Sequence, residues 1–154
     1  MVQTLIIGYG NPLRGDDCLG WEAAELLAGM VRNDTVEVLA VHQLSPELAE
    51  SISEAEQVIF IDASHEGQPG TWKCEPIWPA TESNALGHHF TPGGLLACAQ
   101  AIFNASPAAF LISVAGGSFE YGETLTPPVA TALPEVVRRV CDQISHHDRT
   151  PSHA

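Results

Sequence analysis

The segment TLIIGYGNPLRGDDCLGWEAAELLAGM, residues 4–30, determines how the chain begins to fold. Its opening residues, Thr4–Tyr9, form a continuous apolar run with a glycine near its end. Such a run is typical of a strand that is buried on both faces of a parallel sheet. A loop rich in Gly, Asn and Pro follows. Apolar residues then recur at helical spacing over Leu19–Val31, and Asp16 or Asp17 is placed to cap that helix. The segment therefore predicts a strand, a polar loop and a helix.

The rest of the chain continues this alternation. Val36–Val41 and Gln57–Asp62 predict two more strands, and Pro46–Ser53 predicts the helix between them, so we expect right-handed parallel crossovers. Further elements are expected at Thr71–Ile77 (an edge strand), Pro92–Asn104 (a helix capped by Thr91), Ala109–Val114 (a strand) and Pro127–His146 (a helix). The sequence thus predicts a three-layer α/β fold, with a mostly parallel, twisted five-stranded sheet and helices on both faces.

Size and charge limit the possible functions. The chain has 154 residues, 45% of them hydrophobic and 16% charged, which suits a single domain with a real core. We assign that domain to residues 1–146 and expect a polar, disordered tail over residues 147–154. The formal charge of −13 argues against nucleic acids and anionic membrane surfaces as partners. A basic protein partner or a cation suits this charge better.

Targeting signals and cysteines point to the cytoplasm. The N-terminus carries no basic region, and its apolar run is too short for a signal peptide or a membrane span. The four cysteines are scattered without a CxxC pair, so we expect reduced, structural thiols and no zinc-finger cluster. The expected protein is cytoplasmic and monomeric.

The first loop does not have the pattern of a dinucleotide site. Gly8 and Gly10 follow a strand, but the position where a third glycine is needed is Leu13, and Pro12 interrupts the turn. A polar loop separates Gly10 from the helix, so the helix N-terminus is not brought to a pyrophosphate. The chain also lacks a GxxxxGK[ST] phosphate loop. We therefore do not expect a nucleotide cofactor.

Polar side chains instead cluster where the predicted strands end. In a parallel sheet these ends meet at one edge, where functional groups collect. Each residue alone has an ordinary explanation as a cap, a loop residue or a surface residue, and the argument rests on their convergence. The candidates are Asp16 and Asp17 after the first strand, His42 and Gln43 after the second, Asp62 at the end of the third, and His88 and His89 before a later helix.

Two carboxylates and an imidazole predict a divalent-metal site. Such nitrogen and oxygen donors suit zinc, nickel, manganese or iron. Without a cation, two nearby carboxylates would repel each other and one would tend to stay protonated. Nucleophilic catalysis by serine is disfavoured because the chain has no GxSxG motif. Cys18 is expected to be packed on the first helix.

Four motifs resemble the hydrogenase maturation endopeptidases. The first loop resembles the N-terminal signature of that family, and an apolar strand ending in aspartate, a histidine before a Leu-rich helix and a late Gly-rich loop follow in the same order. The resemblance extends from about Thr4 to Val140. The matching segments are GYGNPLRGDDCLGW (residues 8–21), VIFIDA (58–63), GHHFTPGGLL (87–96) and GGSFEYGETLTPPV (116–129).

The resemblance implies a specific reaction. The family removes a short C-terminal extension from the large-subunit precursor of a nickel–iron hydrogenase, after nickel has been inserted. The family's metal ligands correspond to Asp17, Asp62 and His88, with Asp17 in place of the commoner glutamate, and His89 is a less suitable ligand. The nickel would be carried by the precursor, and another divalent metal could take its place in vitro.

The segment HQLSPELAE (residues 42–50) resembles the subgroup that matures bidirectional, NAD-linked hydrogenases, so His42 and Gln43 are expected to help select the precursor. The catalytic candidates are Asp17, Asp62 and Asp16, the last as the nearest candidate for a general base. Two alternatives stay open at this point. One is a non-enzymatic, nickel-dependent chaperone for the precursor, and the other is a small-molecule metallohydrolase.

Overall fold

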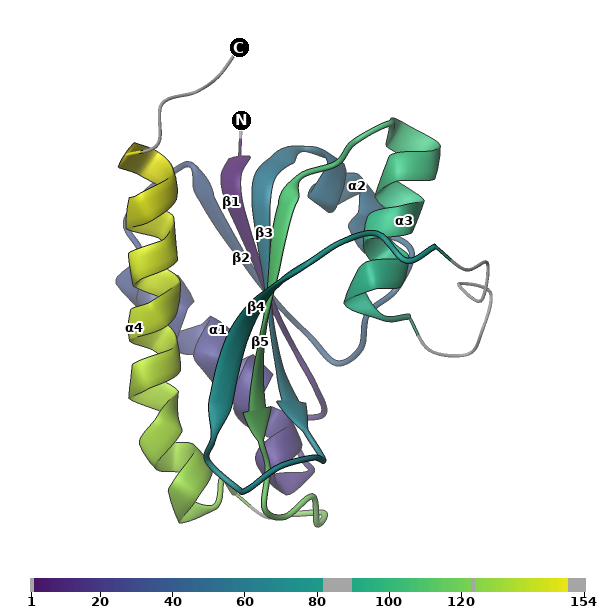
Figure 1. The fold of residues 1–154 in the computed structure, drawn as a ribbon. Helices are drawn as coiled ribbons and strands as arrows, with labels where there is room; N and C mark the ends of the chain where they lie inside the picture. Colours follow the sequence, from purple (N-terminus) through teal and green to yellow (C-terminus); the bar gives the residue numbers. More distant parts are fainter. Residues whose placement is uncertain (1, 82–89, 123, 150–154) are drawn as a thin grey trace.

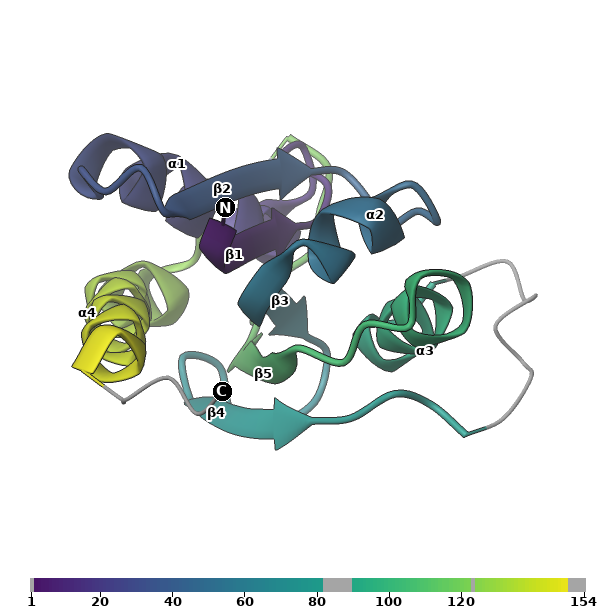
Figure 2. The same ribbon diagram turned by 90° about the horizontal axis from the view of Figure 1, so that it is seen from above.

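A computed structural model describes residues 2–81, 90–122 and 124–149, and these residues form an α/β fold around one sheet (Figure 1). The sheet has five strands in the order β2-β1-β3-β5-β4, which Figure 2 shows from above. The strands are β1 (Val2–Tyr9), β2 (Val36–Val41), β3 (Ala55–Ser64), β4 (Trp72–Ile77) and β5 (Ala108–Ala115). The helices are the 3₁₀ turn η1 (Gly15–Cys18), α1 (Leu19–Met30), α2 (Leu48–Ser53), α3 (Pro92–Phe103) and α4 (Pro127–Arg149).

Strand direction brings four carboxyl ends to one edge of the sheet. β1 pairs in parallel with β2 and β3, and β3 pairs in parallel with β5. Only the edge strand β4 runs antiparallel, against β5. The loops after β1, β2 and β3 therefore lie near one another, at the edge where ligands bind in open α/β sheets.

Apolar residues on both faces of the sheet explain the continuous apolar strand sequences. In β3, Ile59 and Ile61 belong to a core layer shared with α1 and α4, whereas Val58 and Phe60 belong to a second layer shared with α2 and α3. Figure 1 shows the two helix pairs on opposite sides of the sheet. The predicted three-layer α/β class is confirmed. No helix among residues 2–81, 90–122 and 124–149 is long and apolar enough to cross a membrane.

Most element boundaries agree with the sequence prediction, and two differ at helix ends. α2 begins at Leu48, because residues Pro46 and Glu47 form a turn before it. α4 continues to Arg149, so residues 147–149 are helical and were wrongly placed in a disordered tail. The Nε2 atom of His147 lies 3.0 Å from Oε1 of Glu56 on β3, which holds this last turn against the sheet. Residues 150–154 lie outside the described part of the chain.

The prediction that Asp16 or Asp17 caps the first helix is wrong. Cys18 is the N-cap of α1, and no side chain there makes a capping hydrogen bond. Both aspartates lie instead in the turn η1 that precedes the helix. Their carboxylates are consequently free to bond to segments outside α1.

The predicted cap of α3 is confirmed and can be tested. The Oγ1 atom of Thr91 accepts a hydrogen bond from the Gly94 backbone N–H at 3.0 Å. We expect Thr91→Ala to lower the free energy of unfolding by about 1 kcal/mol, because one N–H at the helix start loses its partner. Urea denaturation would measure the change. Thr91→Ser keeps the oxygen and should retain most of the stability; equal losses in both variants would show that the cap is not the cause.

Candidate active site

A pocket of about 450 Å³ lies at the edge of the sheet where β1, β2 and β3 end. Its lining comes from the ends of β1 and β3, from the segments that follow β1, β2 and β3, and from Phe90 before α3. Four residues that the sequence predicts for the site, Asp17, Asp62, His42 and Gln43, all line it. The remaining lining residues are Tyr9, Gly10, Leu44, Ser45, Pro46, Ala63, His65 and Phe90. The structure thus brings together side chains from segments more than forty residues apart.

Asp62 is held in an environment that disfavours its negative charge. The pKa of its carboxyl group is raised to about 6, mainly by burial and to a smaller extent by the nearby Asp17 carboxylate. Hydrogen bonds from the Tyr9 hydroxyl and the Ala63 backbone N–H act in the opposite direction and offset part of this effect. Two carboxylates in a partly buried pocket therefore repel each other, and a bound cation would relieve that repulsion.

Asp17 reaches the pocket because of a close backbone contact. The Asn11 backbone N–H donates a hydrogen bond of 2.8 Å to its Oδ2 atom. Gly10 has a φ angle of +144°, and a Cβ atom at this position would collide with the backbone oxygen of Asp17. Only glycine allows the loop to pass this close to η1, so the first motif fixes the position of the Asp17 carboxylate.

Tyr9 is a pocket residue that the sequence analysis did not predict. Burial raises the pKa of its hydroxyl, and the charge of Asp62 raises it further, so the phenol stays protonated and donates to Asp62. The alternation along β1 contained the signal. Leu5 and Ile7 face the layer of α2 and α3, and Tyr9 follows on the same face at the strand's carboxyl end.

Two histidines at the pocket are packed against aromatic rings. His42 meets the ring of Trp21 edge to face, with ring centroids 5.1 Å apart. His65, which was not predicted, stacks on Phe119 with centroids 3.8 Å apart. These contacts fix the orientation of both imidazoles. The position of His65 three residues after Asp62 could have indicated it.

The predicted metal site is described only in part. His88 and His89 lie outside the described residues. Within the described ranges, no three His, Cys, Asp or Glu side chains lie close enough to hold a metal ion together. Asp17 and Asp62 are the two predicted ligands that the structure places in one pocket. The three-ligand site stays a prediction.

Asp16, the predicted general base, makes a different set of contacts. Its side chain is fully buried. Oδ2 accepts hydrogen bonds from the backbone N–H groups of Gly117 and Ser118 and from Oγ1 of Thr126, and Oδ1 accepts one from the Thr126 backbone N–H. Burial by itself would raise the pKa of Asp16, but these hydrogen bonds outweigh it and hold the pKa below its usual value. The residue does not line the pocket, and its contacts indicate that it anchors the late Gly-rich loop.

The solved structures most relevant to this arrangement are proteases. The hydrogenase maturating endopeptidase HybD from E. coli superposes with a TM-score of 0.77 at 24% identity, covering 94% of this chain and 93% of that one. The chain has the fold of a hydrogenase maturation protease. A [NiFe] hydrogenase maturation protease, HycI, from Thermococcus kodakarensis gives a TM-score of 0.75 at 22% identity, covering 92% of this chain and 91% of that one.

A third solved structure, a hydrogenase 2 maturation peptidase from a Thaumarchaeota archaeon, gives a TM-score of 0.71 at 24% identity. It covers 93% of this chain and 98% of its own. No family model matches the sequence, and no curated protein matches it either. At these identities the likeness establishes the fold, so the chemistry has to be argued from the pocket.

Proposed function

We propose that this chain is an endopeptidase that removes the C-terminal extension of a nickel–iron hydrogenase large-subunit precursor after nickel insertion. The observation that carries the proposal is the meeting of Asp17 and Asp62 in one pocket, in a chain that shares its fold with solved hydrogenase maturation proteases. The same two residues are the family's ligand positions in the motif resemblance.

The pocket would recognise the nickel that the precursor carries. Asp17 and Asp62 supply carboxylate oxygens, and His88 would add an imidazole, a donor set that suits a divalent cation such as nickel. Mutual repulsion of the two carboxylates favours capture of a positive charge. In this proposal the metal belongs to the substrate and positions the scissile peptide against the pocket.

The loop after β2 would select the precursor. His42 and Gln43 line the pocket beside Asp62, and the contact of His42 with Trp21 gives that loop a fixed shape. This arrangement supports the proposed role of the loop in distinguishing clients, with the precursor of a bidirectional, NAD-linked hydrogenase as the first one to test. We propose that the protein acts as a monomer in the cytoplasm, a compartment in which its four free cysteines would stay reduced.

The deciding experiment compares nickel-loaded with nickel-free precursor. We expect the purified protein to shorten only the loaded precursor, because the two carboxylates need the cation for binding, and mass spectrometry would detect the shorter chain. Asp62→Ala should leave the precursor intact, whereas Glu25→Gln, a change of an exposed carboxylate on α1 away from the pocket, should not affect cleavage.

Other results of this experiment would select other functions. Equal cleavage of both precursors would reject nickel as the recognition element. Tight binding with unchanged chain length would indicate a nickel-dependent chaperone. Hydrolysis of small amides without action on any precursor would indicate a small-molecule metallohydrolase.

A further inference from the structure

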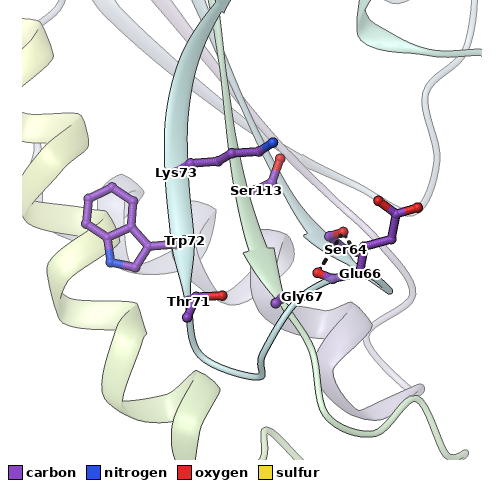
Figure 3. Close-up of a pocket in the computed structure, with 8 residues that line it drawn as sticks. Ser64, Glu66, Gly67, Thr71, Trp72, Lys73 and Ser113 are labelled. Atoms are coloured by element: carbon purple, nitrogen blue, oxygen red, sulfur yellow. Dashed lines mark hydrogen bonds between the residues drawn. The ribbon is translucent and has the colours of Figure 1, made fainter.

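A second cavity, of about 480 Å³, lies near the end of β3 (Figure 3). β3 contributes to both, because Asp62 lines the first cavity and Ser64 lines the second. Alternate residues of a strand point to the same face, so both open on the side of the sheet that carries α2 and α3. The second cavity is lined by Ser64, Glu66, Gly67, Thr71, Trp72, Lys73, Ser113 and Ala115.

Strand register connects the two cavities through one row of residues. Asp62 on β3 pairs with Ser113 on β5, and Ser113 pairs with Lys73 on β4. The row crosses three adjacent strands at right angles to the chain direction. Neighbouring strands lie about 4.8 Å apart, so the Cα atoms of Asp62 and Lys73 are roughly 10 Å apart. An extended peptide covers that distance in about three residues.

The ammonium group of Lys73 places a positive charge at the β4 end of this row. Lys73 is the single lysine of the chain, and among the described residues it is the one Lys or Arg side chain that lines either cavity. Figure 3 shows its ammonium group reaching over the sheet toward the hydroxyl of Ser113. Its ion pair with Glu75, at 3.6 Å and largely exposed, contributes little and leaves the ammonium able to bind another anion.

The surroundings of Lys73 favour a substrate carboxylate. The carboxylates that line the two cavities in the described part of the chain are Asp17, Asp62 and Glu66, and the chain carries a net charge of −13. An anionic group on a peptide is therefore repelled along most of the row and attracted at its Lys73 end. The hydroxyl of Ser113 has no hydrogen-bond partner among the described residues, so it can donate to the same carboxylate.

We propose that Lys73 is a specificity-determining residue that binds a carboxylate of the precursor's C-terminal extension, within about three residues of the scissile bond. The inference rests on the proposed function, because that function places the nickel-bearing part of the precursor at Asp17 and Asp62. The extension then leaves along the row toward Ser113 and Lys73. The carboxylate belongs to an Asp or Glu side chain or to the chain end.

Kinetics of precursor cleavage test the proposal. Lys73→Met should raise KM about tenfold with kcat unchanged, since the contact is made equally in the ground state and the transition state. Lys73→Arg should restore most of the affinity, and Glu75→Gln is the matched control that leaves KM unchanged. An unchanged KM in Lys73→Met would overturn the proposal.

Changes in the substrate identify the carboxylate. Replacing the acidic residues of the extension by their amides should raise KM for the wild-type protein and have no further effect on Lys73→Met. If amidation of the chain end has that effect instead, the bound group is the terminal carboxylate. Additive effects of the protein and substrate changes would overturn the pairing.

A binding measurement separates this proposal from the proposed function. The probes are the blocked peptide acetyl-Gly-Ala-Glu-Ala-amide and its Gln counterpart, followed by the backbone NMR shifts of Ser64, Lys73 and Ser113. The acidic peptide should shift these signals in the wild type and not in Lys73→Met. Such binding without any precursor cleavage would reject the protease function and keep the subsite, whereas cleavage with no dependence on Lys73 in either assay would reject the subsite alone.

Discussion

Asp62→Asn is expected to abolish precursor processing and, at the same time, to stabilise the free protein at pH 8. If Asp62 binds the substrate's metal as proposed, loss of its carboxylate should reduce kcat/KM by at least about 100-fold. The stabilisation arises because Asp62 is held where its charge is unfavourable, between buried surroundings and the Asp17 carboxylate. The charged carboxylate of Asp62 would thus be needed for the proposed function but lowers the stability of the free protein.

The sign of the pH dependence follows from the direction of the shift. The pKa of Asp62 is raised from 3.8 to about 6 in the folded protein, so the folded state binds this proton more tightly than the unfolded state. Its contribution to stability is fully present below pH 3.8 and is lost as the pH rises through about 6. A shift of about two units corresponds to at most about 3 kcal/mol, and we expect a gain of about 1–2 kcal/mol for Asp62→Asn at pH 8 because the side chain is only partly buried.

Urea denaturation of the metal-free protein at pH 4, 6 and 8 would measure this effect. The difference between Asp62→Asn and the wild type should grow with pH, whereas an exposed control, Glu66→Gln, should show no such trend. Equal stability of Asp62→Asn and the wild type at pH 8 would contradict the electrostatic argument. Processing activity within tenfold of the wild type would contradict the assignment of Asp62 to the site.

Asp16→Asn is expected to destabilise the folded protein far more than the same change at the neighbouring Asp17. The wild-type carboxylate accepts four hydrogen bonds in a buried position, three of them at Oδ2. An asparagine side chain has one oxygen, so an NH₂ group must face N–H donors on the other side. We expect a loss of about 2–4 kcal/mol, since buried donors lose charge-assisted partners.

The effect of Asp16 should depend on pH in the opposite sense to that of Asp62. Because its folded pKa lies below the usual value, its stabilisation is present above pH 3.8 and is lost as the pH falls through the folded pKa. Thermal unfolding of Asp16→Asn and the wild type should therefore differ less at pH 3 than at pH 7. Asp17→Asn, which removes a carboxylate with one backbone hydrogen bond, is the matched control and should cost far less. A loss in Asp16→Asn no larger than in this control would contradict the anchoring role.

The site could be predicted as far as strand topology determines it. Apolar runs identified β1, β2 and β3, and parallel crossovers required that Asp17, His42, Gln43 and Asp62 meet at one edge, as they do. The sequence could not distinguish the roles of Asp16 and Asp17. Neighbouring side chains in a 3₁₀ turn point roughly 120° apart, so one faces the pocket and the other the interior.

Contacts between loops that are far apart in the sequence could not be predicted either. The partners of Asp16 lie 101–110 residues away, and nothing in the local pattern indicates them. The same holds for the stacking of His65 on Phe119, which depends on where the late loop folds back. The antiparallel direction of β4 depends on tertiary pairing with β5, which an isolated six-residue strand does not reveal.

The anchoring of Asp16 also bears on the order of events while the chain is being made. The loop that carries Asp17 leaves the ribosome early, but its hold on Gly117 and Thr126 has to wait for about a hundred further residues. At about 5–20 residues per second, this delay is on the order of 5–20 s. A nascent chain therefore lacks these contacts of Asp16 until residue 126 has been made.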